Sequence, residues 1–370
     1  MENKKEQKER FFGRRSFMKL AGLSAFGLSM GFPLRARWAM AEESPPGGIQ
    51  GHWWRKNEDG YAYFVQDNLR TDWLDQGYLL AKLDHKWMVF KTAEFEEEFH
   101  TWWLEEKLSY YDKLERSIAG EDVEIPNGGH HHPMLGTYGN KYRNRGDSYF
   151  HLNVTPKGYT LLPKAEYIRQ IIEEVDEIYN TSTNLPADIF NYRKEKYQDE
   201  DLWDKNKFAT LEVYTGHPID DDDPMKLSFK ETHTFQNVMV NPMATVTYMS
   251  VYNTPGGQSY FYGDEGQTPT FEFRGFCWMI SPYNPNLTQY EIDVSNYLNQ
   301  AFSKYHGLRD DFIANIFVIC EEFNNSPTDS DLYGLGKRVV PPFTYGDALK
   351  AKLKSFFSKK GILKKGIQYF

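Results

Sequence analysis

The chain has 370 residues, with 43 Lys and Arg against 52 Asp and Glu and a formal net charge of −9. This acidic balance argues against nucleic acid as a partner, because binding to phosphates needs a basic surface. With Cys277 and Cys320 as its only cysteines, the sequence has neither the haem-attachment motif Cys-x-x-Cys-His nor the thiolates of an iron–sulfur cluster.

Residues 1–41 have the layout of a twin-arginine signal peptide. A basic start leads into Arg-Arg-Ser-Phe-Met-Lys at 14–19, an apolar stretch covers 20–34, and Ala39-Met40-Ala41 has the small-x-small pattern of a cleavage site. We therefore expect cleavage after Ala41 and export of the folded protein to the periplasm. The usual reasons for this route are a cofactor or metal inserted in the cytoplasm, or a partner that carries one.

The mature part predicts an α+β protein of two regions. The signal holds nine Lys and Arg and three acidic residues, so the remaining 329 residues carry a net charge of about −15. No later run of apolar residues is long enough for a transmembrane segment. We expect a flexible leader, a mixed helix-containing region, a β-sandwich and a basic tail, over 42–51, 52–205, 206–345 and 346–370 respectively.

Two helices are predicted in the first region. Aromatic residues near helical spacing indicate a helix over about 93–118, with Thr92 as its cap and Gly120 as its stop. Pro163 suits the first turn of a second helix. Its apolar stripe consists of Ile168, Ile171, Ile172, Val175, Ile178 and Tyr179.

Short alternating segments predict strands in the second region, at 245–252, 271–280, 289–294 and 313–321. Gly and Pro clusters separate them, which is typical of an antiparallel sandwich. Both cysteines fall in these strands, either as two buried thiols or as a cross-strand disulfide. The expected core includes Val246, Tyr248, Phe273, Cys277, Ile292 and Val318.

Four phrases occur in order between about Leu227 and Phe323: Val246–Asn253 followed by Pro255, Phe261–Gly263, Tyr290–Leu298 and Ile316–Ile319. Together they resemble the C-terminal β-sandwich domain of the tyrosinase, polyphenol oxidase and haemocyanin family. The resemblance implies the sandwich fold without the oxidase chemistry. That family's copper-binding bundle needs six histidines, several on helices, and here no two histidines are three or four residues apart.

Three consecutive histidines form the most unusual local feature. In an extended chain His130 and His132 point to the same side, so they could hold one metal ion, with His151 as a third ligand. Imidazoles suit copper and zinc, among other metals. The alternative is a solvated Gly-rich loop that happens to contain histidines.

Weaker candidates lie elsewhere in the sequence. Glu231 and His233 share a face of a predicted strand, with His217 upstream, and the acidic run 220–223 could bind a hard cation or be a solvated loop. The tryptophan pairs 53–54 and 102–103 could form a stacking platform for a sugar, or lie half in the core.

These patterns favour a non-catalytic function. The sequence predicts an exported, metal-associated accessory or binding protein that serves as a partner of a copper or other redox enzyme. One alternative is a metal-dependent periplasmic oxidoreductase or hydrolase that uses His130, His132 and His151. The other is a glycan-binding protein with an aromatic platform.

Overall fold

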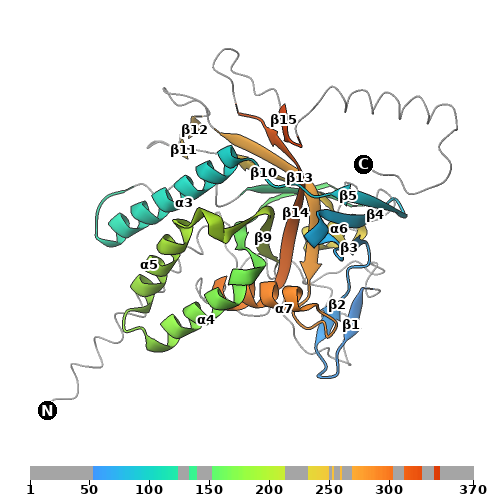
Figure 1. The fold of residues 1–370 in the computed structure, drawn as a ribbon, viewed down its shortest axis with the longest axis horizontal. Helices are drawn as coiled ribbons and strands as arrows, with labels where there is room; N and C mark the ends of the chain where they lie inside the picture. Colours follow the sequence, from blue (N-terminus) through green and yellow to red (C-terminus); the bar gives the residue numbers. More distant parts are fainter. Residues whose placement is uncertain are drawn as a thin grey trace, which may run out of the picture.

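The structure is a computed structural model. It describes residues 53–123, 133–139, 152–212, 232–249, 252–253, 259–260, 269–302, 312–326 and 337–341 (Figure 1). The predicted signal peptide, the leader and the C-terminal tail lie outside the described residues. Among the described residues, no helix is both long and apolar enough to cross a membrane.

One large antiparallel sheet organises the described part of the chain. Its main path runs in the order β7-β6-β10-β13-β14-β9-β8, and β15 pairs with the end of β14. Helices flank this sheet, so the predicted α+β class is confirmed. The strands are β6 (Met134–Tyr138), β7 (Leu152–Pro156), β8 (Thr160–Pro163), β9 (Trp203–Glu212), β10 (Met243–Met249), β13 (Thr270–Ile280), β14 (Ile313–Asn324) and β15 (Lys337–Val340).

The sheet takes strands from both of the regions that the sequence suggested. β6, β7 and β8 come from the first region, and β10, β13 and β14 from the second, yet all belong to one hydrogen-bonded sheet. The pairing of β6 with β10, which sets Val246 opposite Leu135, joins the two regions directly. The junction between the two regions, at residues 205 and 206, falls within β9.

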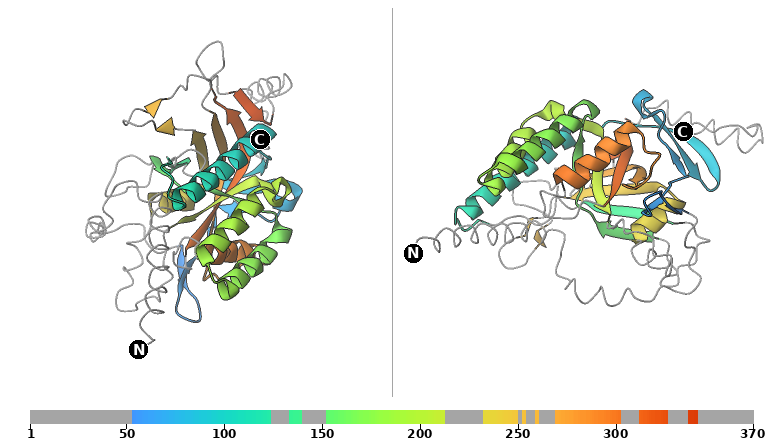
Figure 2. Two further views of the ribbon diagram at one scale, coloured as in Figure 1. Left: turned by 90° about the vertical axis from the view of Figure 1, so that its left-hand side faces the viewer. Right: turned by 90° about the horizontal axis from the view of Figure 1, so that it is seen from below.

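The sheet curls until its two ends meet. β7 and β8 are the first and last strands of the path, but only residues 157–159 connect them. Rings also meet across the interior: Phe208 on β9 lies 5.4 Å from Tyr248 on β10, although two strands separate β9 from β10 in the sheet. The result is a partly closed cylinder with an inner and an outer face (Figure 2).

Helix α3 (Glu97–Ile118) closes one end of this interior. Its Phe99 is fully buried and contacts the rings of Phe208, Tyr248 and Phe273, with centroid distances of 5.6, 5.1 and 4.6 Å. The helix matches the predicted one except at its start, where Glu96 rather than Thr92 is the N-cap. Gly120, at φ +91°, follows its end as expected.

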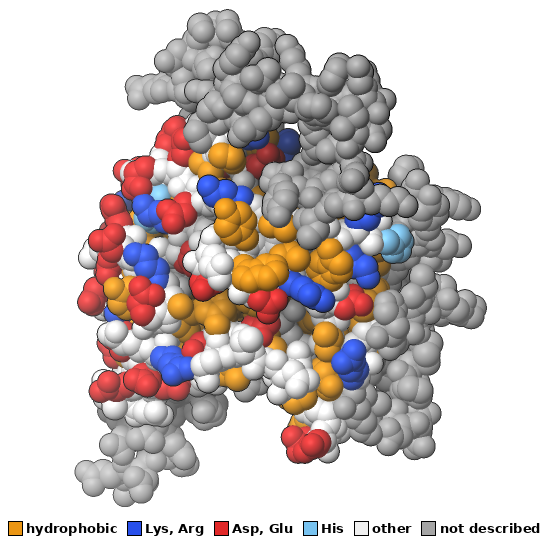
Figure 3. Space-filling view, turned by 45° about the vertical axis from the view of Figure 1, so that its right-hand side comes forward, with side chains coloured by type: hydrophobic (Ala, Val, Ile, Leu, Met, Phe, Trp, Pro, Cys, Tyr) orange, Lys and Arg blue, Asp and Glu red, His pale blue; other side chains and the backbone are white. Residues whose placement is uncertain are grey.

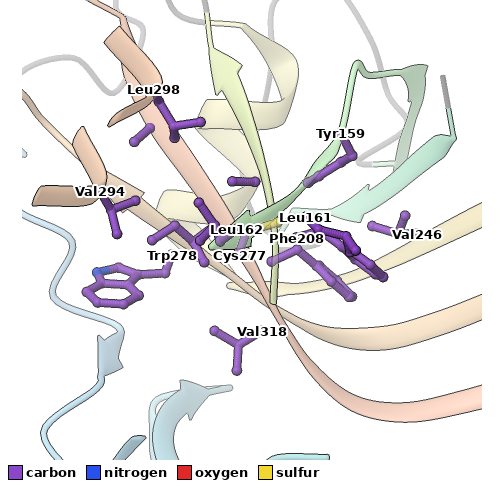
Figure 4. Close-up of a cluster of buried hydrophobic side chains, with 14 of the residues drawn as sticks. Tyr159, Leu161, Leu162, Phe208, Val246, Cys277, Trp278, Val294, Leu298 and Val318 are labelled. Carbon is purple, nitrogen blue, oxygen red and sulfur yellow. The ribbon is translucent and has the colours of Figure 1, made fainter. Parts of the chain in front are cut away.

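A second core covers the outer face of the sheet. Trp278 on β13 stacks on Tyr290 of α7 (Gln289–Asn296), with 5.9 Å between ring centroids. Figure 4 shows Trp278, Val294 and Leu298 gathered on one side and Tyr159, Phe208 and Val246 on the other. The π-helical turn η4 (Tyr297–Phe302) continues α7, and α4 (Ala165–Thr181) packs against both. The predicted helix is thereby confirmed, with Ile168, Ile171 and Val175 buried, but Pro163 ends β8 and does not lie in the first turn of α4.

Smaller elements complete the structure. A three-stranded sheet packs on the outer face through Phe90, whose ring lies 4.6 Å from that of Phe276. Helix α5 packs against α3 and α4, and α6 lies over β6, β7 and β13. These elements are β1 (Trp54–Lys56), β2 (Ala62–Phe64), β3 (Leu69–Arg70), η1 (Leu74–Gln76), β4 (Tyr78–Leu83), β5 (Lys86–Lys91), α5 (Leu185–Tyr197), η2 (Glu200–Leu202), α6 (His233–Val240), β11 (Tyr252–Asn253) and β12 (Ser259–Tyr260).

Two segments predicted as strands are helices. Residues 289–294 belong to α7, because Thr288 and Glu291 form a capping box that satisfies the first backbone N–H groups. His233 begins α6, where the Thr232 hydroxyl accepts a hydrogen bond from the N–H of Phe235. As a consequence Ile292 is 37% exposed and is not a core residue, whereas the other five expected core residues are buried.

Candidate functional site

The three predicted metal ligands, His130, His132 and His151, lie outside the described residues. The strands that follow them are described and pair antiparallel, with Met134 opposite Pro156 and Tyr138 opposite Leu152. Met134 and Leu152 are therefore at opposite ends of the ladder, about 13 Å apart at 3.3 Å per residue. A site that uses all three histidines requires the chain before one strand to fold back along the ladder. Among the described residues, no three His, Cys, Asp or Glu side chains are gathered so that they could hold a metal ion.

The tryptophan pairs do not form a platform. Trp53 and Trp103 are buried, at 3% and 0% exposure. The ring of Trp54 stacks on Phe235, and Trp102 packs against Phe271 in the inner core. These side chains complete the packing between the helices and the curled sheet, and so they are not free to stack on a sugar. This is the second of the two alternatives that the sequence left open, in which each tryptophan pair lies half in the core.

Among the remaining sequence candidates, His233 is the one that the structure describes. His233 is exposed at the start of α6, not on a strand. Its expected companions His217 and Glu231, and the acidic run 220–223, lie outside the described residues.

A polar cluster occupies the interior of the curled sheet at the end away from α3. Glu212, at the end of β9, is fully buried. The ammonium of Lys157 lies 2.7 Å from both of its carboxylate oxygens, and the hydroxyl of Thr232 donates to Oε2 at 3.1 Å. Lys157 comes from the short link between β7 and β8, so this ion pair ties the closing edge of the sheet to β9. Because both partners are largely removed from water, loss of one would leave the other charge buried.

Cys277 borders this cluster. The pKa of its thiol is raised to about 12, mainly by burial and next by the negative charge of Glu212, whereas hydrogen bonds with Tyr159 and Asn315 act in the opposite direction. Those contacts are poorly aligned, because the Tyr159 hydroxyl and both amide atoms of Asn315 have no hydrogen-bond partner of good geometry. A thiol with such a pKa is protonated at neutral pH and is a poor nucleophile or metal ligand. Cys277 and Cys320 are both free thiols; Cys277 is buried, as the first of the two sequence interpretations expected, whereas Cys320 is only partly buried.

A second buried carboxylate lies at the other end of the interior. Glu322 on β14 is fully buried, and its Oε2 accepts the backbone N–H of Glu96 at 2.7 Å, just before α3 begins. Its other oxygen has no partner. Burial raises the pKa of this carboxyl to about 8; the hydrogen bond from Glu96 lowers it, and the charges of Glu96 and Glu98 raise it. Glu322 therefore anchors α3 to the sheet in a mostly protonated form at neutral pH. Nothing in the sequence marks it among 52 acidic residues.

An uncharged surface covers the solvent side of β7, β6 and β10. Its nine outward positions form three rows of three in register, and none is charged. Five of the nine large exposed hydrophobic residues among the described residues lie here, led by Leu152 at 65% and Val154 at 64%. We call this surface the outer apolar face. It comprises Met134, Gly136, Tyr138, Leu152, Val154, Pro156, Met243, Thr245 and Thr247.

Other exposed surfaces differ in character. On the face displayed in Figure 3, hydrophobic side chains are mixed with Lys and Arg, and acidic side chains line one margin. The outer apolar face lies on the opposite side of the cylinder from α4 and α7, and β6 and β7 are visible there in the right-hand view of Figure 2. Concentration of exposed apolar side chains in one place marks interaction sites on soluble domains, whereas single exposed ones do not.

Comparison with known proteins adds little to this description. No protein-family model matches the chain, and no curated protein matches it. Among solved structures it is similar to HupZ of Group A Streptococcus, with 11% identity, a TM-score of 0.24, and coverage of 55% of this chain and 89% of that one. It is also similar to HutZ of Vibrio cholerae, described as a heme storage protein, with 9% identity, a TM-score of 0.25, and coverage of 56% and 89%. At such TM-scores these likenesses carry no argument about fold or function.

Proposed function

We propose that this chain is an exported, non-catalytic accessory or binding protein that acts by docking through its outer apolar face. The observation that carries the proposal is the concentration of Leu152, Val154 and three further exposed hydrophobic residues on one uncharged sheet face. In a chain with 26% charged residues, nine outward positions without a charge are unusual. Their exposure to water is unfavourable unless another surface covers them.

The ionisable groups of the interior support a binding role over a catalytic one. Glu212 is held by Lys157, Glu322 is used to anchor α3, and the Cys277 thiol has a raised pKa. General acid–base or nucleophilic catalysis needs such groups within reach of a substrate and with a pKa near the working pH. The rival proposal, a metal-dependent oxidoreductase or hydrolase, depends on His130, His132 and His151. The glycan-binding alternative lacks its tryptophan platform, because Trp53 and Trp103 are buried.

Docking can be tested in cells with a photo-reactive amino acid. We place it at Val154 on the outer apolar face and, as a matched control, at Ile292, which is exposed on α7. We expect covalent adducts from position 154 and none from position 292. If positions 154, 152 and 243 all give no adduct in the compartment where the protein resides, it does not dock through this face.

Export by the twin-arginine route remains part of the proposal and rests on residues 1–41. Replacement of Arg14 and Arg15 by Lys should leave uncleaved precursor in the cytoplasm, seen as a larger band in fractionated cells. Continued export of this variant would show that another route is used.

Metal association also remains part of the proposal, with copper or zinc held by His130 and His132. These two imidazoles form the minimal metal site. Because Met134 and Leu152 lie at opposite ends of the β6–β7 ladder, the contribution of His151 is tested separately. Elemental analysis of exported protein should show metal in the wild type and in His151→Ala if the pair suffices, and none in a variant with Ala at 130 and 132. If the wild-type protein carries no metal and binds none, metal association is removed from the proposal and the accessory role alone stays. The sandwich character of 206–345, and its likeness to the tyrosinase family, stand as proposals beside the observed curled sheet.

A further inference from the structure

We infer that the outer apolar face is the interface between two copies of this chain, which stack face to face as a two-fold dimer. This inference rests on the proposed docking function and names the partner. It starts from the register of the three strands: Gly136 lies opposite Val154 on one side and Thr245 on the other, at the centre of the face.

The uncharged grid suits sheet-on-sheet packing. Two sheets that stack with their strands within about 30° of each other interdigitate outward side chains and exclude water over a layer about 10 Å thick. Leu152 and Val154 project from one edge of the grid, and Gly136 leaves a shallow centre where a Cβ atom would meet nothing closer than 3.7 Å. A two-fold axis through this centre sets the projecting residues of each copy beside the lower centre of the other. Such an isologous contact closes on itself.

Charge favours a second copy over a partner of a different kind. Each copy has a net charge of −9 or below, so two copies repel unless they meet where neither carries charge. The outer apolar face meets that condition. On the neighbouring strand β13, Glu272 and Arg274 already neutralise each other, at 2.6 Å. A basic partner would instead be attracted to the acidic surfaces, and the outer apolar face offers it nothing electrostatic.

The area is sufficient for a modest dimer. Five large side chains that are two-fifths to two-thirds exposed present on the order of 500 Å² of apolar surface per copy, before the rim is counted. Specific interfaces bury about 1,000 Å² or more of surface in total, so two such faces reach the lower end of this range. Thr245, Thr247 and Pro156 supply the polar and neutral rim that such interfaces have. We therefore expect dissociation in the micromolar range.

The test measures the mass of the purified mature chain, residues 42–370, by sedimentation at 1 to 100 µM. We expect a concentration-dependent dimer. Val154→Lys should weaken the dimer at least 100-fold, because it buries an unpaired charge in the interface. Ile292→Lys, an equal change on the exposed part of α7, should leave the dimer intact. Circular dichroism of both variants should match the wild type, since both positions face solvent.

A cysteine variant tests directly whether position 154 lies near the second copy. Val154→Cys should be joined to its counterpart in the second copy by a flexible bis-maleimide cross-linker, whereas Ile292→Cys should not; Cys277 is buried, and the partly exposed Cys320 is replaced by Ser in both variants. A wild type that is monomeric at 100 µM overturns the inference. If the photo-reactive residue at 154 then captures a protein of different mass in cells, the docking function survives with another partner; if it captures none, both fail.

Discussion

The buried carboxyl of Glu322 makes a quantitative prediction about stability and pH. Its folded-state pKa is about 8, against an ordinary value of 4.5. Between these values the folded chain holds a proton that the unfolded chain has lost, so stability falls as pH rises through the folded pKa. From pH 6.5 to 8 the difference spans about 1.5 pH units, which at 1.4 kcal/mol each amounts to about 2 kcal/mol. Burial of an ionised carboxylate with one unpartnered oxygen is the physical cause.

Glu322→Gln should remove this dependence. The glutamine amide carbonyl can accept the N–H of Glu96 as the carboxyl does, and it carries no charge at any pH. Free energies of unfolding from urea titrations of both proteins at pH 6.5, 7.5, 8.5 and 9 give the comparison. The wild type should lose about 2 kcal/mol relative to the variant across this range.

The range and the controls isolate this one group. Burial lowers the pKa of His100, and the effect of this group is common to both proteins and cancels in their difference. Burial also lowers the pKa of Lys107, whose effect is common to both proteins and cancels in their difference. Glu105→Gln, at an exposed position of the same helix, should follow the wild type. Parallel curves for the wild type and Glu322→Gln would refute the reasoning.

Three further predictions follow from close packing. Gly275→Ala should cost more than 3 kcal/mol of unfolding free energy or prevent folding, because a Cβ atom there would overlap the carbonyl oxygen of Val318, whereas Gly136→Ala should unfold like the wild type. Phe99→Ala should cost about 3–5 kcal/mol, measured by urea titration, because it empties the centre of the inner aromatic core. The thiol of Cys277 should not react with a disulfide reagent at pH 8 until urea unfolds the chain; reaction at the rate of a free thiol would contradict its burial.

Local patterns predicted the elements whose periodicity was strong. The apolar stripe of Ile168, Ile171 and Val175 specified α4, and the alternation around Val246 and Tyr248 specified β10, because burial on one side imposes a period on the sequence. Residues 289–294 also alternate, but the capping box at Thr288 decides for a helix. This short segment therefore carries a strand signal and a helix signal, and its alternation, which predicts a strand, is the weaker of the two.

The arrangement of the sheet and the candidate surface could not be predicted in the same way. Pairing of Thr137 with Ala244 joins segments far apart in the chain, and neither segment marks the other as its partner. β6 contains Gly136 and lies beside the histidine run, so this part of the sequence resembled a loop. Its outward residues form a surface only together with those of β7 and β10, which lie on either side of it.

The position of β14 in the sheet has a consequence for biosynthesis. β14 lies between β13 and β9 in the curled sheet, yet it follows both of them, and every other strand of the main path, in the chain. Until the residues of β14 leave the ribosome, β9 and β13 both lack the strand that lies between them, and the backbone N–H and C=O groups along these edges are unpaired. Unpaired edges of this kind aggregate, and sheets dominated by non-local pairing form slowly. We therefore expect nascent chains to need protection by a chaperone until β14 has left the ribosome.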